Sequence, residues 1–233
     1  FLSYLFTAGK TNRDLSELLF GMVRQKGTKL PSYYEKEEVL AIENAVCRSS
    51  CKGKRDYAMI LLASRLGLRG SDIVNLNLNN LDWENNVIRL TQQKTGQEVI
   101  LPLLTEVGNA LAEYLRYVRP QSNIKTVFLS LSPPIRPLSI GTFRCILVEY
   151  FREAGVKFQE KHHGPHSSRH SLASRMLENG ISMPVISEAL GHSTTETTLS
   201  YLKIDINALL RCSLSVPPVS DDFYNQKGGV LYG

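Results

Sequence analysis

Four separated pieces of this 233-residue chain carry side chains that could act on a phosphate ester. Arg69 lies in the run Leu-Gly-Leu-Arg-Gly-Ser-Asp, and Lys94 lies in a Lys-Thr-Gly turn. The third piece is His-Ser-Ser-Arg-His at positions 166–170, and the fourth is Leu-Gly-His-Ser, whose His192 stands nine positions before Tyr201. Each piece alone is weak evidence, but their joint occurrence in this order is hard to obtain by chance.

Arginines suit the first need of phosphodiester cleavage, which is to neutralise two negative oxygens while a fifth ligand approaches phosphorus. A guanidinium group keeps its charge and holds phosphate oxygens in a bidentate fork, so Arg69 and Arg169 are candidate clamps. The imidazoles of His166 and His192 can add hydrogen bonds to the same oxygens. We therefore predict that these four residues bind the phosphate.

Tyr201 and Lys94 have the side chains that the remaining steps require. A phenol oxygen can hold the phosphoryl group covalently, and it leaves more easily than an aliphatic hydroxyl when the reaction reverses. The departing sugar oxygen needs a proton, which a lysine on a hairpin turn can donate. Tyr201 is the predicted nucleophile and Lys94 the predicted general acid.

Several of these residues also have a simpler interpretation. His166 and His170 have a spacing that suits zinc, although no Glu of an His-Glu-x-x-His motif lies between them. Tyr201 could be a core aromatic, and Arg69 could stabilise the C-terminal end of a helix dipole. Lys94 could belong to a common solvated turn.

Apolar residues at helical spacing predict a mainly α fold with one small three-stranded antiparallel β-sheet. The β-like runs at 87–90 and 99–101 flank a polar turn and predict a hairpin between 81 and 102. Helices are predicted over 15–23, from Glu35 onward, and over 55–66, 107–118, 140–151, 168–177, 185–190 and a stretch ending near 210.

Composition favours a globular protein with a polyanionic partner. The formal charge is +5 and 42% of residues are hydrophobic, enough for a substantial core. There is no apolar run long enough to cross a membrane and no secretory signal, so a cytoplasmic, nucleoid-associated protein is expected. The four cysteines form no Cys-x-x-Cys pair and are expected to be reduced; Cys47 and Cys51 have helical spacing but no second ligand pair.

From about Leu30 to Lys203 the sequence resembles the tyrosine recombinase and phage integrase family. The resemblance implies the catalytic-domain fold of that family and a catalytic set in which Asp72 and His170 support the site. It implies no cofactor and no metal. The residues to which it assigns catalysis are Arg69, Lys94, His166, Arg169, His192 and Tyr201.

The resemblance also implies a division of the chain. Residues 1–30 would be the end of a truncated core-binding domain and its linker, 31–212 the catalytic domain, and 213–233 a C-terminal tail. The chain begins at Phe1 and is expected to be a piece of something longer. The tail could exchange with a neighbouring protomer, as in the family, or could be a disordered or self-docked end.

The expected function is site-specific DNA recombination through a 3′-phosphotyrosyl intermediate, without metal or ATP. Partners would be double-stranded recombination sites, with two protomers on each site and four in a synapse. A type IB topoisomerase-like enzyme and a non-catalytic DNA-binding protein are the alternatives. Cations expected to contact DNA are Arg24, Lys26, Lys29, Arg136 and Arg144, although basic runs are more often solvated faces.

Overall fold

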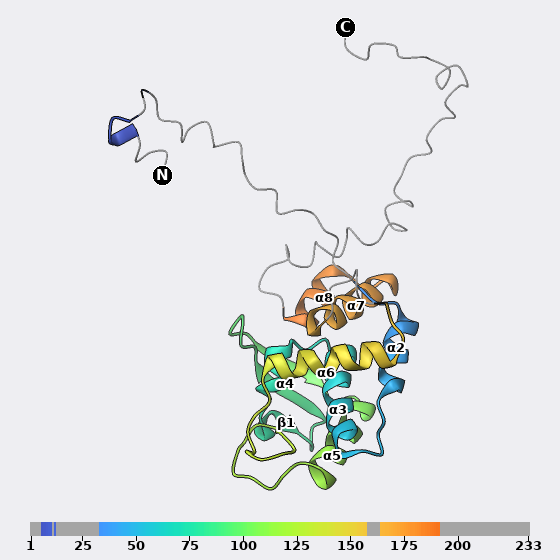
Figure 1. Ribbon diagram of the computed structural model, residues 1–233. Helices are drawn as coiled ribbons and strands as arrows, with labels where there is room; N and C mark the ends of the chain where they lie inside the picture. Colours follow the sequence, from blue (N-terminus) through green and yellow to red (C-terminus); the bar gives the residue numbers. More distant parts are fainter. Residues whose placement is uncertain (1–5, 11, 13–32, 158–163, 192–233) are drawn as a thin grey trace, which may run out of the picture.

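A computed structural model of the chain describes residues 6–10, 12, 33–157 and 164–191. Helices and one small sheet make up this part, and Figure 1 shows α6 crossing the molecule with α7 and α8 together at one end. The elements are α2 (Lys36–Ala45), α3 (Cys51–Arg65), α4 (Gly70–Val74), the 3-10 helix η2 (Leu78–Asn80), β1 (Leu81–Asp82), β2 (Val87–Thr91), β3 (Glu98–Pro102), α5 (Thr105–Tyr117), α6 (Ile140–Glu153), α7 (Pro165–Glu178) and α8 (Met183–Leu190).

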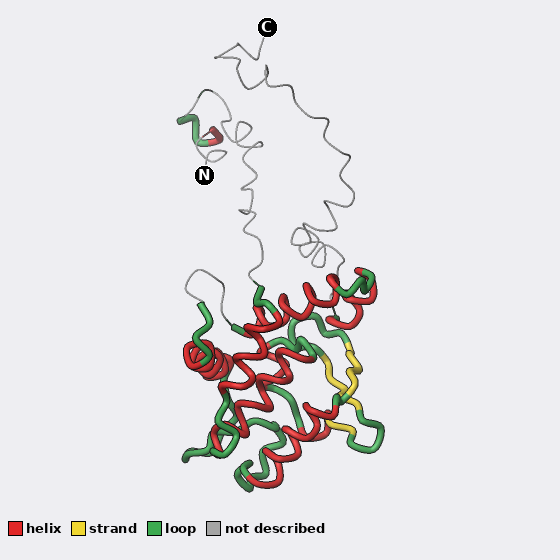
Figure 2. The backbone as a smooth tube through the Cα atoms, turned by 90° about the vertical axis from the view of Figure 1, so that its right-hand side faces the viewer, coloured by secondary structure: helices red, strands yellow, loops and turns green. Residues whose placement is uncertain are grey.

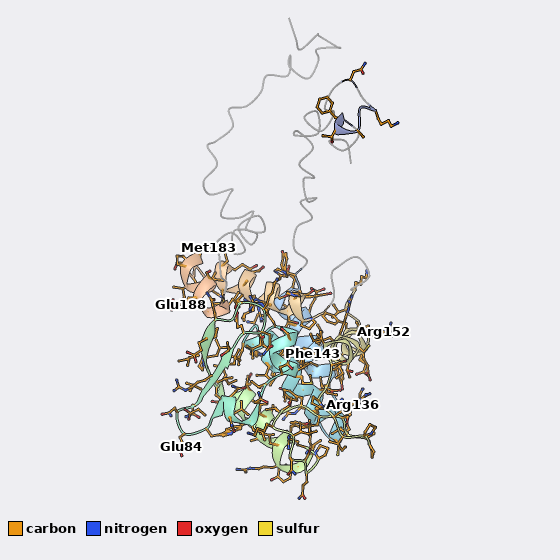
Figure 3. The ribbon with its side chains drawn as sticks, turned by 90° about the vertical axis from the view of Figure 1, so that its left-hand side faces the viewer. Glu84, Arg136, Phe143, Arg152, Met183 and Glu188 are labelled. Atoms are coloured by element: carbon orange, nitrogen blue, oxygen red, sulfur yellow. The ribbon has the colours of Figure 1, made fainter. Side chains whose placement is uncertain are left out.

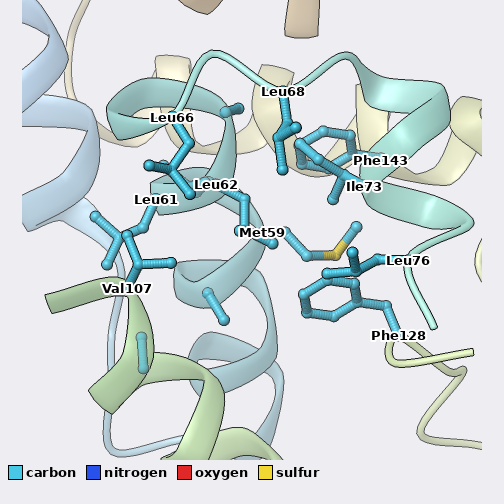
Figure 4. Packing of buried hydrophobic residues seen from close by; sticks show 14 of the residues in the cluster. Met59, Leu61, Leu62, Leu66, Leu68, Ile73, Leu76, Val107, Phe128 and Phe143 are labelled. Atoms are coloured by element: carbon cyan, nitrogen blue, oxygen red, sulfur yellow. The ribbon is translucent and has the colours of Figure 1, made fainter. Parts of the chain in front are cut away.

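Helix α3 is the centre of the core. It begins at Cys51 rather than near Arg55, because the Ser50 hydroxyl caps it by accepting from the Gly53 N–H at 2.9 Å. All residues from 58 to 64 are buried, so α3 has neighbours on every side. Figure 4 shows its side chains, Met59 and Leu62 among them, packed against residues of the following helices and loops.

The sheet is antiparallel with the order β1-β2-β3, and Figure 2 shows it along one side of the helices. Ile88 pairs with Leu101, and Leu90 pairs with Val99. These four residues are buried while their neighbours along each strand are not, which is the alternation expected of a sheet with one covered face. The predicted three-stranded sheet is confirmed, and its hairpin turn carries Lys94.

Helix α7 begins at Pro165, directly after Gly164. Gly164 has a φ of 141°, and Pro165 occupies the first helical turn, where its missing N–H costs no hydrogen bond. Ser167, Ser171 and Ser174 are buried on the helix. Their small side chains allow α7 to lie close to α3, and the Ser171 hydroxyl accepts from the backbone N–H of Tyr34 at 2.8 Å.

Helix α8 forms a second, smaller apolar cluster with α7. Ala173 from α7 packs with Ile186 and Leu190 from α8. The helix ends at Gly191, which has a φ of 61° and is the C-cap in the left-handed conformation that glycine adopts at low cost. This position directly precedes His192.

The cysteine pair Cys47 and Cys51 lies at the junction of two helices. Cys47 follows the end of α2 and Cys51 is the first residue of α3, so their spacing is not that of one helix; both are exposed free thiols. Asp72 lies in the short helix α4. Among the described residues, no helix combines the length and apolar composition needed to cross a bilayer.

Candidate active site

Arg69 is the N-cap residue of α4, so it does not stabilise a helix C-terminus as one interpretation supposed. Its side chain is 9% exposed. One guanidinium nitrogen, Nη1, donates to Oε1 of Gln92, and the other, Nη2, donates to the carbonyl oxygen of Gly191 at 3.4 Å. Arg69 takes part in no ion pair among the described residues, which leaves its charge available to an anion.

Arg169 reaches the same place from α7. It is 3% exposed, and its Nη1 donates to the carbonyl oxygen of Gly67 at 2.9 Å while Nη2 donates to that of Leu190. The two arginines are 100 residues apart in sequence, yet they bond to the adjacent carbonyls of Leu190 and Gly191. The end of α8 therefore holds both guanidinium groups.

His166 lies in the first turn of α7 and is exposed on one side. Partial burial, followed by the positive charges of Lys94, Arg169 and Arg69, lowers the pKa of His166 below its ordinary value. The structure thus brings together four of the six predicted catalytic residues.

Asp72 connects α4 with the hairpin that carries Lys94. It is 4% exposed, and its Oδ1 accepts from the backbone N–H of Gln93 at 2.9 Å. Its Oδ2 is buried and has no hydrogen-bond partner among the described residues. The Asp72 carboxylate accepts a hydrogen bond from the residue before Lys94, so it helps to set the position of the turn.

His170 lies one turn after His166 on α7, and the two ring centroids are 6.4 Å apart. Within the described part of the chain, no group of three or more His, Cys, Asp or Glu is placed to hold a metal ion. The zinc interpretation of this pair therefore has no third ligand there.

Several predicted residues lie outside the described part of the chain. Described structure stops at Gly191, so neither the nucleophile candidate nor the second histidine has a geometry here, and the same holds for the tail and for the cations of the N-terminal linker. These residues are His192, Tyr201, Arg24, Lys26 and Lys29.

Arg136 and Arg144 are both exposed, and Figure 3 shows Arg136 on the face that also carries the start of α6. Arg136 lines a cavity of about 570 Å³ together with Lys52, Arg55 and Ser139. Lys52 and Arg55 each form an ion pair with a carboxylate, whereas Arg136 forms none among the described residues. Arg136 is therefore the cation of this cavity whose charge no carboxylate offsets in the described part of the chain, and it favours an anionic occupant.

Gln92 is a site residue that reasoning from the sequence missed. It is 2% exposed and accepts from Arg69. A signal was present, because Gln92 continues the buried register of Ile88 and Leu90 on β2. A polar side chain that is buried at the end of a strand needs hydrogen-bond partners.

Comparison with known proteins decides the family. The model of the phage integrase family matches residues 33–207, which is most of the chain. The chain belongs to the phage integrase family. This confirms the resemblance that the motifs indicated.

Curated relatives of this family member include recombinases. An integrase/recombinase of Sinorhizobium fredii is 36% identical over 93% of this chain and 52% of the relative. A second protein of that organism with the same description is 32% identical, covering 81% of this chain and 97% of the relative. Tyrosine recombinase XerD of Staphylococcus aureus is 34% identical over 76% of this chain and 59% of the relative. The chain thus spans about half the length of the first of these relatives.

Solved structures show the same fold. XerH site-specific recombinase bound to palindromic difH substrate has a TM-score of 0.69 and 21% identity over 82% of this chain and 55% of that one. A lambda integrase dimer bound to a COC′ core site has a TM-score of 0.63 and 18% identity over 94% and 72%. At these identities the likeness shows the fold, and the predicted catalytic-domain fold is confirmed.

Proposed function

We propose that this chain is the catalytic part of a site-specific tyrosine recombinase that cleaves and rejoins DNA. Two buried guanidinium groups converging on the end of α8, beside His166 and Lys94, carry the proposal. Such a group of fixed cations is suited to the charge that develops on a phosphate during transfer. Membership of the phage integrase family supports the same reaction.

In the proposed reaction the hydroxyl of Tyr201 loses its proton and attacks the scissile phosphate, and the bond between phosphorus and the 5′-oxygen breaks. The products are a 3′-phosphotyrosyl bond and a 5′-hydroxyl, whose oxygen takes a proton from Lys94. Arg69, Arg169 and the two histidines would hold the nonbridging oxygens. In rejoining, a 5′-hydroxyl attacks the phosphotyrosyl bond and releases Tyr201. The phosphotyrosyl bond conserves the energy of the broken phosphodiester bond, so rejoining needs no other energy source.

The proposed partner is double-stranded DNA. XerH and lambda integrase are described as bound to DNA sites, the latter as a dimer, and we extend this to two protomers of the present protein per site and four per synapse. We propose that Arg136 and Arg144 contact the backbone outside the cleavage point. The cavity that Arg136 lines, where its charge has no ion-pair partner among the described residues, supports that placement.

A trapping experiment tests the function. DNA nicked close to the cleavage point loses the short fragment that carries the 5′-hydroxyl, so a cleaving enzyme remains covalently attached. We expect a denaturation-resistant protein–DNA complex from the wild type and none from Tyr201→Phe, with similar non-covalent affinity. Covalent complex from Tyr201→Phe would overturn the assignment of the nucleophile, and its absence from the wild type would favour a non-catalytic DNA-binding protein.

A further inference from the structure

Gln92 lies at the junction of three catalytic segments. It follows β2 directly, and its side chain is 2% exposed, although Gln93 and Gln97 in the same turn are exposed. The turn that it begins contains Lys94. Burial of one glutamine among three in a hairpin turn requires specific partners for its amide.

The amide of Gln92 has partners on both sides. Its Oε1 accepts from Arg69 Nη1 and from the Thr95 hydroxyl, the latter at 2.9 Å. Its Nε2 donates to the carbonyl oxygen of Leu190 at 3.1 Å. A guanidinium group can only donate and a carbonyl oxygen can only accept, so chemistry leaves one orientation for this amide.

The end of α8 is packed against the same side chain. A Cβ at Gly191 would lie 2.8 Å from Cδ of Gln92, which is closer than real Cβ contacts. The glycine therefore lets the backbone before His192 approach the amide. Because Arg69 and Arg169 both donate to carbonyls of this segment, the position of Gln92 affects where both groups are held.

The backbone of Gln92 closes the turn that carries Lys94. Its N–H donates to the Gln97 carbonyl at 2.8 Å, and its own carbonyl accepts from the Gly96 N–H at 2.9 Å. One residue therefore joins the base of the lysine turn, the guanidinium of Arg69 and the end of α8. These segments are far apart in sequence, and Gln92 adds to the links that Arg69 makes with Gly191 and that Asp72 makes with Gln93.

We infer that Gln92 is a positioning residue of the cleavage reaction, which sets the Arg69 guanidinium and the Lys94 turn against the end of α8. The inference rests on the proposed recombinase function and adds to it a residue outside the predicted catalytic set. Gln92 touches no reacting atom in this role. It acts through Arg69, and its effect should appear in the rate of cleavage more than in the affinity for DNA.

Methionine and asparagine at position 92 would each lack one property of the glutamine side chain. Methionine has a similar length but neither donates nor accepts strongly, so the guanidinium of Arg69 and the carbonyl of Leu190 lose a partner each. Asparagine keeps the amide but is one methylene shorter, so it cannot span both groups. Gln92→Met and Gln92→Asn are therefore complementary tests, and the second retains a polar group if the first impairs folding.

The experiment measures single-turnover cleavage of nicked DNA by the full chain, at saturating DNA and below the thermal unfolding midpoint of each variant. We expect Gln92→Met and Gln92→Asn to cleave about 10- to 100-fold more slowly than the wild type, with dissociation constants for DNA within about twofold. Gln97→Met, the same substitution at an exposed glutamine of the turn, should cleave like the wild type.

A double-mutant cycle with Arg69→Lys separates positioning from a structural role. If Gln92 acts through Arg69, adding Gln92→Met to Arg69→Lys should slow cleavage by less than about threefold. Additive defects would overturn the inference, as would wild-type rates in both single variants or a loss confined to DNA affinity. A wild type that forms no covalent complex overturns the recombinase function together with this inference, whereas cleavage by both Gln92 variants at the wild-type rate overturns the inference alone.

Discussion

At the scale of single residues, the site depends on how two guanidinium groups are held without losing their charge. Arg69 is held by a side-chain amide and a backbone carbonyl, and Arg169 donates to the carbonyls of Gly67 and Leu190. Carbonyl and amide oxygens orient a guanidinium but carry no net charge. An incoming phosphate can therefore form the strong charge-assisted contacts.

Arg169→Lys should greatly reduce cleavage. An ammonium cannot donate to Gly67 and Leu190 and also present two nitrogens to a phosphate. We expect a loss of about 100-fold or more in single-turnover cleavage, the scale seen when one donor to developing charge is removed.

A matched control lies on the same helix. Arg175 donates to the carbonyl oxygen of Ser64 at 3.0 Å but is not among the predicted catalytic residues. Arg175→Lys should lower the unfolding midpoint while leaving cleavage within about threefold of the wild type at temperatures where it is folded. If both variants lost cleavage equally, the effect of Arg169→Lys would be one of folding.

His166 should make the protein less stable in mild acid. Burial and the cations around it lower its pKa in the folded state below the usual value of about 6.5, which the unfolded chain retains. As the pH falls through 6.5, the unfolded state binds the proton first, so stability decreases until the folded pKa is also passed.

The measurement is the denaturant midpoint of unfolding at pH 7.5 and at pH 5. We expect the denaturant midpoint of the wild type to fall further between these two pH values than that of His166→Gln. The variant has no imidazole to titrate at this position and retains the same carboxylates. Identical losses in the two proteins would contradict the role of His166 in this pH dependence.

At the scale of elements, the site is a meeting point of the loop before α4, the β2–β3 turn and the end of α8. Close approach of the first and third requires glycine. Gly67 has a φ of 61°, and a Cβ there would lie 2.8 Å from Cδ2 of Leu190 and 2.9 Å from Cδ2 of Leu172. The carbonyl of the same glycine holds Arg169.

Gly67→Ala should therefore lower the free energy of unfolding and slow cleavage together. The left-handed backbone costs about 1 kcal/mol for alanine, and the collision with two leucines adds about 1–3 kcal/mol. Gly155→Ala is the control, because Gly155 has a φ of 67° with nothing within 4 Å of its Cβ position.

Denaturant unfolding of the two variants separates backbone strain from crowding. Gly155→Ala should lose only the free energy that the left-handed backbone costs, and it should cleave normally. Gly67→Ala should also lose the free energy that the collision with the two leucines costs. Equal destabilisation would mean that the α7 and α8 leucines move aside without cost.

At the scale of the whole molecule, a net charge of +5 favours DNA as a partner, but the distribution of charge matters more than its sum. Arg136 is an unpaired cation among the described residues and lines the cavity beside α6, and Arg144 is exposed on that helix. These two positions are suited to phosphate contacts at a distance from the cleavage point.

Combined substitution of Arg136 and Arg144 by glutamine should weaken DNA binding and its dependence on salt. Each lost phosphate contact reduces the slope of log K against log salt by about 0.9, so the double variant should lose about 1.8. Titrations at several salt concentrations measure this slope.

The control removes equal charge elsewhere, through glutamine at the exposed Arg48 and Arg116. Its slope should remain within experimental error of that of the wild type. Equal changes in the two double variants would show that net charge alone governs binding, and Arg136 and Arg144 would have no special place in it.

The sequence by itself indicated the fold class and the family, and it named candidate residues for phosphate chemistry. Alternating apolar residues in β2 and β3 and helical spacing elsewhere reflect local periodicity, which requires no knowledge of distant contacts. Arg69, Arg169 and His166 could be named as candidates because phosphate chemistry restricts the residue types that can serve. Family membership, shown by comparison, agrees with both.

Only the tertiary structure decided how these residues are held. The contacts of Gln92 with Arg69 and Leu190, and of Asp72 with Gln93, join segments between about twenty and one hundred positions apart. No local pattern encodes such pairings, because they depend on how α4, the hairpin and α8 pack together. Gly67 likewise reads as an ordinary loop glycine until Leu190 is seen beside it, since close packing between distant segments is a property of the folded chain.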